Sequence, residues 1–202
     1  MKSMIHVPSF IRGLSIIFLL GLIANFGVSG KQADSQWAPK ADQLPKLTKE
    51  ETVDRYKIKI PGNYTVHTRT GDPKIISGNI WVGEKRADGV RPFLMLTIAS
   101  PPKEELDKLT LQQSLSTFLA VIEKKQKNWK QNKVEEGLIG GIKFIRSYWE
   151  GTEPKSGRPL HGFNYVAIDG ERVINLSSQD TDPFYKESLP LTESAVLTFK
   201  KF

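Results

Sequence analysis

The sequence contains no cysteine among its 202 residues. This absence excludes a disulfide framework, and it also excludes a lipid-modified cysteine after an export signal. Stability must therefore come from an ordinary hydrophobic core. A content of 39% hydrophobic and 25% charged residues, close to the average of soluble globular proteins, allows such a core.

Long apolar runs are also scarce. The longest, residues 16–24, is interrupted by Asn25 and is short of the ~20 residues that span a bilayer. Basic residues precede this run, at Lys2 and Arg12, and the small residues 28–30 follow it. The pattern predicts that residues 1–30 are a secretory signal peptide cleaved near Lys31, or alternatively an uncleaved membrane anchor. Either way the rest of the chain is exported, and is periplasmic or anchored to the outer face of the cytoplasmic membrane.

The chain has no large excess of charge of one sign. The formal net charge is +7, but 22 acidic residues are scattered among 29 lysines and arginines. Nucleic-acid-binding domains usually gather their basic residues on one face or in one run. We therefore expect no nucleic-acid partner, and we expect contact with a membrane only through the N-terminal segment.

The composition divides the rest of the chain into two parts. Residues 31–55 are polar and contain two prolines, and they are interpreted as a flexible tether. Within them, Thr48 and Glu51 have the spacing of a capping box, which indicates one short helical turn. Residues 56–202 are interpreted as one globular domain.

Apolar segments separated by turn residues predict seven strands in this domain, at 56–60, 79–82, 93–99, 134–139, 142–149, 162–168 and 172–177. Asp169-Gly170 predicts a tight hairpin, and Gly140-Gly141 either a hairpin or a bulge. Strand 142–149 has bulky residues on both faces, which indicates a central strand covered on both sides. The connection 151–161 is long for a hairpin.

The clearest helix is expected to begin after Thr110, which forms a capping box with Gln113. An apolar stripe recurs at helical spacing after it, at Leu111, Leu115, Phe118, Leu119, Ile122 and Trp129. Lys124, Lys125 and Lys127 fall outside this stripe. A lysine cluster can bind phosphate or a membrane, but here it is interpreted as a solvated helix end.

A second helix is expected near the C-terminus. Asp182 is expected to cap its start, with Pro183 at the first helical position, and Leu191, Ala195 and Phe199 recur at helical spacing towards its end. The predicted fold class is α+β, with an antiparallel sheet of about six to seven strands between helices.

The order of these motifs resembles the PsbP-like superfamily. The residues that match the family pattern are Tyr56-x-Ile58-x-Ile60-Pro61-Gly62-x-Tyr64, Ser114-Leu115, Gly140-Gly141-x-x-Phe144-x-Arg146, Asp169-Gly170-x-Arg172-Val173-x-x-Leu176 and Ser194-Ala195-x-x-x-Phe199. The resemblance covers about residues 56–202. It implies a curved antiparallel sheet packed between helices, and a binding or assembly module more than an enzyme. No set of functional residues is carried over by it.

No catalytic, cofactor or metal motif stands out in the sequence, and no cofactor is expected. The residues from which an enzyme could still assemble a site are His67, His161, Asp180 and Asp182, beside a cleft lined by Trp149 or Trp81. This alternative is a small-ligand-binding or hydrolase-like enzyme.

The favoured function is an exported, non-enzymatic binding or assembly module at the cell envelope, with an unknown protein partner. The expected contact with that partner is the connection 151–161. It presents Arg158 and His161 beside Trp149, a composition typical of interface hot spots, and function concentrates on loops that a rigid scaffold holds.

Overall fold

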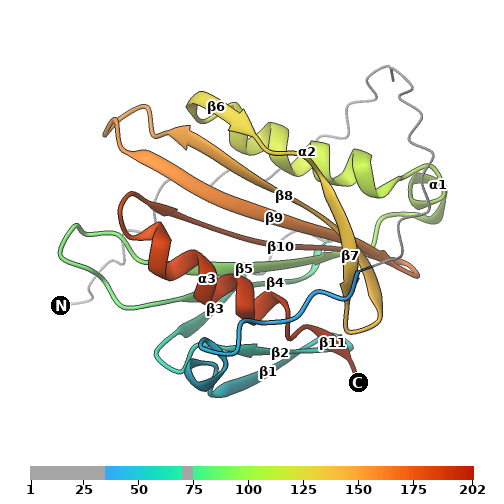
Figure 1. Cartoon of the computed structure of the whole chain (residues 1–202). Helices are drawn as coiled ribbons and strands as arrows, with labels where there is room; N and C mark the ends of the chain where they lie inside the picture. Colours follow the sequence, from blue (N-terminus) through green and yellow to red (C-terminus); the bar gives the residue numbers. More distant parts are fainter. Residues whose placement is uncertain (1–34, 70–74) are drawn as a thin grey trace, which may run out of the picture. The chain divides into compact units, whose positions relative to one another are not determined.

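The computed structural model describes residues 35–69 and 75–202, and its main element is an eight-stranded antiparallel sheet (Figure 1). The order across the sheet is β3-β4-β5-β10-β9-β8-β6, and β7 also pairs with β8. The strands are β3 (Thr65–Arg69), β4 (Ile75–Val82), β5 (Phe93–Ala99), β6 (Lys127–Gln131), β7 (Glu135–Ile139), β8 (Ile142–Thr152), β9 (Pro159–Asp169) and β10 (Arg172–Thr181). The predicted α+β class is confirmed. The large sheet has eight strands where six to seven were expected, and the predicted strand 56–60 belongs to a separate, smaller sheet.

A smaller antiparallel sheet is formed by β1 (Lys49–Val53), β2 (Tyr56–Ile60) and β11 (Lys200–Lys201), in the order β1-β2-β11. A short 3-10 helix, Leu44–Lys46, precedes it. The helices are α1 (Lys103–Leu106), α2 (Leu111–Glu123) and α3 (Tyr185–Val196).

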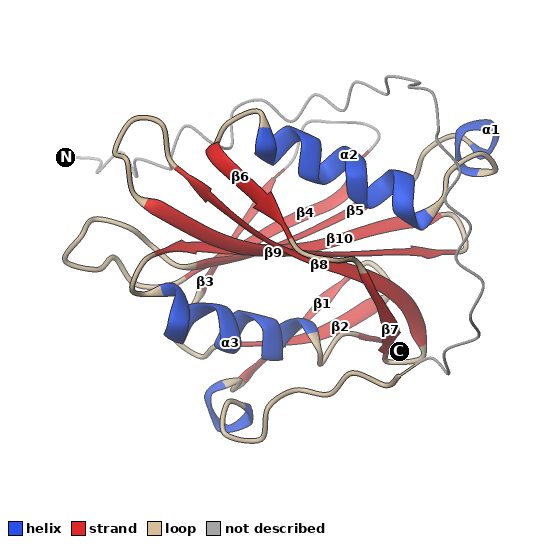
Figure 2. Cartoon of the chain, turned by 45° about the horizontal axis from the view of Figure 1, so that its top comes forward, coloured by secondary structure: helices blue, strands red, loops and turns tan. Residues whose placement is uncertain are grey.

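The two longer helices cover opposite faces of the large sheet (Figure 2). Helix α2 contacts β8 and β9, and α3 contacts β10, β9 and β2. On the α2 side the core consists of Leu115, Leu119, Ile145, Trp149, Leu160 and Val166. On the other side α3 and the small sheet enclose the larger core, which includes Trp81, Phe144, Phe163, Tyr165, Leu176 and Phe199.

Burial on both faces explains why the central strands have no simple alternation of apolar and polar residues. Six consecutive residues are buried in β9, 162–167, and six in β10, 173–178. In β8, Phe144 packs into one core and Ile145 and Trp149 into the other, as predicted. The turns Gly140-Gly141 and Asp169-Gly170 both form hairpins, with Ile139 opposite Ile142 and Asp169 opposite Arg172.

The helix after Thr110 is confirmed, including its capping box, but it ends at Glu123. Trp129 was expected on its apolar stripe and lies instead on β6, where it stacks on Trp149 with ring centroids 5.1 Å apart. Trp129 matches the helical spacing by chance, since it belongs to the strand that follows the helix.

The expected tether is the main error on the N-terminal side. Residues 49–53 pair along their full length with 56–60, and Leu47 and Val53 are buried in the larger core. Thr48 and Glu51 therefore do not begin a helical turn. This segment has few hydrophobic residues, but they pack into a core to which the rest of the chain contributes most of the residues.

The C-terminal helix also differs from the expectation. It begins at Tyr185 and not directly after Asp182, and its first residue is preceded by Phe184, whose side chain makes no capping hydrogen bond. The chain then continues beyond the helix into β11.

The predicted signal or anchor, residues 1–30, lies outside the described residues. Within the described part of the chain, the model contains no helix with the length and apolar character needed to span a bilayer.

Leu119 tests the packing of α2. It is 3% exposed in the core on the α2 side, so Leu119→Ala should lower the free energy of unfolding by about 2–5 kcal/mol, because the lost side chain leaves a cavity. Lys124→Ala, at an exposed position one residue beyond the helix, should cost less than about 0.5 kcal/mol. Equal losses in urea unfolding would contradict the orientation of α2.

Candidate functional site

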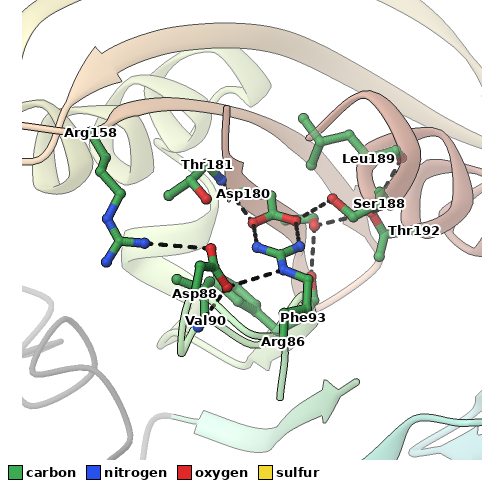
Figure 3. A network of polar contacts seen from close by, with 11 residues as sticks. Arg86, Asp88, Val90, Phe93, Arg158, Asp180, Thr181, Ser188, Leu189 and Thr192 are labelled. Carbon is green, nitrogen blue, oxygen red and sulfur yellow. Dashed lines mark hydrogen bonds and ion pairs between the residues drawn. The ribbon is translucent and has the colours of Figure 1, made fainter. Parts of the chain in front are cut away.

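Three connections meet at one end of the large sheet, and we call this region the loop end. They are residues 83–92 between β4 and β5, residues 153–158 between β8 and β9, and residues 182–184 between β10 and α3. Figure 3 shows the polar contacts that join them. The connection 151–161 identified from the sequence belongs to this end, although β8 and β9 extend into it and leave only 153–158 as a loop.

A buried ion pair fastens the loop end to the sheet. The guanidinium of Arg86 binds Asp180 through two hydrogen bonds, Nη1 to Oδ2 at 2.5 Å and Nη2 to Oδ1 at 2.6 Å (Figure 3). The Asp180 side chain is 1% exposed and also accepts hydrogen bonds from the Ser188 hydroxyl and the Thr181 amide. Every oxygen of this buried carboxylate thus has a donor, as a buried charge requires.

The aromatic residue before α3 completes this arrangement. The Arg86 guanidinium lies 4.1 Å from the centre of the Phe184 ring, within cation–π distance. Hydrogen bonds to Asp180 raise the pKa of Arg86 although burial opposes the charge. Residues 83–92 are therefore held both to β10 and to the start of α3.

Asp88 connects residues 83–92 to residues 153–158, the tip of the β8–β9 hairpin. Its carboxylate accepts from the Val90 amide at 3.0 Å, from Arg86 Nε at 3.4 Å and from Arg158 Nη1 at 3.4 Å. Burial acts to raise the pKa of Asp88, but these donors outweigh it and hold the pKa below its ordinary value. Arg158 remains 41% exposed, so it bridges to Asp88 and still faces solvent.

His161 also lies at the loop end, on β9. Its ring stacks on Tyr185, the first residue of α3, with centroids 3.6 Å apart, and Nδ1 is 4.0 Å from Glu150. Arg158 and His161 are thus brought to the same end of the sheet, as the sequence predicted. Tyr185 provides an aromatic neighbour that the sequence analysis did not identify.

Trp149 does not belong to this surface. Its side chain is 2% exposed and lies in the core on the α2 side, with Nε1 donating to Asn164 Oδ1 at 3.2 Å. It lies opposite Gly162, where an added Cβ would come within 2.3 Å of the indole ring. His161 is the neighbour of Gly162 and points to the other face, because side chains alternate along a strand. The expected grouping of Trp149 with Arg158 and His161 is therefore wrong.

The residues considered for a hydrolytic site are not assembled into one. His67 is exposed on β3, at the far edge of the sheet, and Asp182 is exposed beyond β10. Asp180 lies opposite His161 in the pairing of β9 with β10, but its oxygens bind Arg86. Trp81 and Trp149 are both buried and line no open cleft. Among the described residues, no group of three or more histidines and carboxylates is placed to hold a metal ion.

A second polar cluster, which sequence reasoning missed, surrounds Arg146 on β8. Arg146 donates to Glu135 at 2.8 Å and to the Tyr165 hydroxyl at 2.8 Å, and its guanidinium lies 4.2 Å from the Trp37 ring. Glu193 of α3 accepts from the hydroxyls of Tyr148 and Tyr165. Burial raises the pKa of both tyrosines, so they remain neutral donors. The motif Phe144-x-Arg146 was noted in the sequence, but its partners are distant along the chain.

Comparison with known proteins places this fold. No model of a known protein family matches the chain, and no curated protein sequence matches it. Among solved structures, the chain is similar to the cyanobacterial PsbP (CyanoP) of Synechocystis sp. PCC 6803. The identity is 12%, the match covers 91% of this chain and 99% of that chain, and the TM-score is 0.55. The chain therefore has a PsbP-like fold, as the sequence motifs indicated.

Two further solved structures are similar at a lower level. One is a protein of unknown function from Pseudomonas aeruginosa, with 14% identity over 74% of this chain and 94% of that chain and a TM-score of 0.48. The other is LpqN of Mycobacterium tuberculosis, which is involved in cell envelope biogenesis, with 10% identity over 72% and 82% and a TM-score of 0.49.

The ion pair predicts a large effect of removing Arg86. Arg86→Ala should lower the free energy of unfolding by about 3–5 kcal/mol, because it leaves the buried Asp180 carboxylate without a positive charge to balance it. Adding Asp180→Asn should recover part of this loss. Arg158→Ala, which removes an exposed partner, should cost about 1 kcal/mol or less. A loss for Arg86→Ala as small as that of Arg158→Ala in urea unfolding would contradict the description of the pair.

Asp88 predicts a dependence on pH. Its folded pKa lies below the unfolded value of about 3.9, so folding favours the ionised carboxylate. Its contribution to stability is present above about pH 4 and is lost as the pH falls through the folded pKa. The stability difference between the wild type and Asp88→Asn should therefore shrink on acidification in urea titrations. A difference that stays constant or grows at low pH would show that Asp88 is not held ionised.

Proposed function

We propose that this protein is an exported, non-enzymatic binding module of the cell envelope, and that the loop end is its contact with a protein partner. The observation that carries the proposal is that contacts of Arg86 with Asp180 and Phe184, and of Asp88 with Arg158, join three exposed connections. Binding surfaces are commonly built from loops that a rigid scaffold holds in place. Export is supported by the sequence pattern of residues 1–30.

The surface chemistry at the loop end suits recognition of a protein. Arg158 reaches solvent while Asp88 restrains its guanidinium, so less conformational entropy is lost when it binds. Half-buried aromatic groups lie at the same end of the sheet, at His161, Phe184 and Tyr185. Arginine and aromatic residues are the side chains most enriched at interface hot spots. The loop end therefore offers a restrained arginine and partly exposed rings as anchors for a partner.

Site-specific crosslinking in intact cells tests this proposal. A photo-reactive residue at Lys155, an exposed position of the hairpin tip, should give a discrete adduct with an envelope protein. The matched control is the same residue at Lys103, which is also exposed but lies at the start of α1, beyond the opposite ends of the strands. Adducts that are equal at the two positions, or found only at Lys103, would contradict the assignment of the loop end.

Once the crosslinked partner has been identified, replacement of residues 154–158 by a short Gly-Ser link should abolish co-purification of that partner with this protein. The melting temperature should change little, because these residues carry no core side chain and their exposed contact with Asp88 contributes little. Undiminished co-purification with the replaced loop would place the partner site elsewhere.

A further inference from the structure

A continuous basic segment lies at the edge of the large sheet. Between Glu123 and Glu135 the chain contains five lysines and no acidic residue. They follow the end of α2, run along β6 and continue into the link to β7, and we call them the lysine edge: Lys124, Lys125, Lys127, Lys130 and Lys133. Figure 1 shows β6 at the border of the sheet beside the end of α2.

Four members of the lysine edge are exposed and form no ion pair with any residue that the structure describes: Lys124, Lys127, Lys130 and Lys133. Lys57, Lys143 and Lys201, by comparison, each bind a carboxylate, at 3.6, 2.8 and 2.7 Å. Other lysines are exposed as well, and the edge differs from them in gathering several along one border of the sheet. The charge of these four lysines is therefore available to an external anion.

Structural roles explain only part of this segment. Lysines on an edge strand discourage pairing with another sheet, which accounts for Lys127 and Lys130. The helix dipole favours a cation at Lys124. Neither role accounts for Lys133 in the link, nor for the absence of acidic residues throughout 124–134.

The chain enters the domain at the same edge. Ser35 and Trp37 bind the backbone of β7, the Leu138 amide donating to Ser35 O and the Trp37 amide to Leu138 O, both at 3.0 Å. The Trp37 ring covers Gly137, where an added Cβ would lie 2.3 Å from it, and packs against Tyr165. Because β7 and β6 both pair with β8, the entry point and the lysine edge share one border of the sheet.

The direction in which the chain enters the domain relates the entry point to the lysine edge. Gln36 pairs with Leu138 in parallel, so the N-terminal end of this contact is directed towards Glu135, the end of β7 that follows Lys133. Only residues 31–34 separate Ser35 from the end of the predicted signal or anchor. Four extended residues span at most about 14 Å.

We propose that the lysine edge binds the anionic phospholipid surface of the membrane into which the N-terminal segment is inserted. The proposal rests on the proposed export and on retention of that segment as an anchor. One inserted segment combined with a basic patch is the usual requirement for stable membrane attachment, and basic residues near a bilayer are attracted by anionic headgroups. The membrane contact then extends beyond the N-terminal segment alone, along the border of the sheet that begins where Lys127 pairs with Thr152.

The absence of cysteine makes a direct test simple. Asn132→Cys places a single thiol on the lysine edge, and Val66→Cys places one on β3, the opposite edge of the same sheet, where Val66 is 46% exposed. Each full-length variant is spin-labelled and reconstituted in vesicles of phosphatidylcholine, with or without phosphatidylglycerol. Relaxation by a paramagnetic metal chelated to lipid headgroups then reports the proximity of each label to the bilayer.

We expect strong relaxation of the label at residue 132 in vesicles containing phosphatidylglycerol, with a marked decrease in high salt, and weak relaxation at residue 66 in all vesicles. The triple variant Lys127→Gln, Lys130→Gln and Lys133→Gln should lose the effect at residue 132. A matched control with the same change of charge, Lys59→Gln, Lys103→Gln and Lys108→Gln, removes exposed lysines outside the edge and should retain it.

Three results would overturn the proposal: equal relaxation at the two labels, relaxation at residue 132 that ignores lipid charge, or immobilisation of that label by soluble polyglutamate but not by vesicles. The last result would assign the edge to an acidic protein. If the spin-label experiment fails but the crosslink at Lys155 forms, the proposed function stands and only the membrane contact is refuted. If the spin-label experiment succeeds but no crosslink forms at Lys155, only the assignment of the loop end is refuted.

Discussion

The burial of β9 and β10 on both faces is the constraint on which the rest of the structure depends. A sheet covered on one side by α2, and on the other by α3 and the small sheet, offers no open face in its centre. Polar groups inside it must pair with each other, as Asn164 does with Asn175 and Trp149. What remains for contact with other molecules is the ends of the strands and the borders of the sheet. The loop end lies at the ends of the strands, and the lysine edge lies at a border of the sheet.

The same constraint explains where the less exposed ion pairs lie. Arg86 meets the buried Asp180 at the end of β10, and Arg146 meets Glu193, both half-buried, where β8 approaches α3. A buried ion pair adds little net stability over an apolar contact of the same shape, because desolvation offsets the attraction. These contacts instead join segments that are distant in the sequence. Arg86 joins residues 83–92 to β10, and Arg146 joins β8 to α3 and lies against the Trp37 ring of the entering chain.

The sequence predicts the centre of the fold well and its borders poorly. The sequence predicts β8, β9 and β10 because each has an apolar segment bounded by turn residues, with Gly140-Gly141 and Asp169-Gly170 marking tight turns. Residues 65–67 of the edge strand β3 are exposed, and β1 has the composition of a polar linker, so neither segment shows a clear alternation of apolar and polar residues. Each is formed by pairing with the next strand along the chain, β1 with β2 and β3 with β4, and not by its own local preference.

The candidate site was predicted in part, for related reasons. A long connection containing Arg158 and His161 is visible in the sequence, and the structure places both at the loop end. The contacts that hold the loop end together could not be predicted, because their residues are distant in the sequence. Arg86 and Asp180, for example, are 94 residues apart. The error at Trp149 came from treating it as part of the loop, whereas β8 extends to Thr152 and alternation directs the indole inward.

Native-state hydrogen exchange tests the central constraint most directly. If β9 and β10 are enclosed on both faces, their amides should exchange only through global unfolding, with the free energy measured by urea. The amides of the small sheet and of Trp37 should exchange through smaller local openings. Exchange of the β9 and β10 amides at a lower free energy than those of β1 and β2 would contradict a sheet covered on both sides.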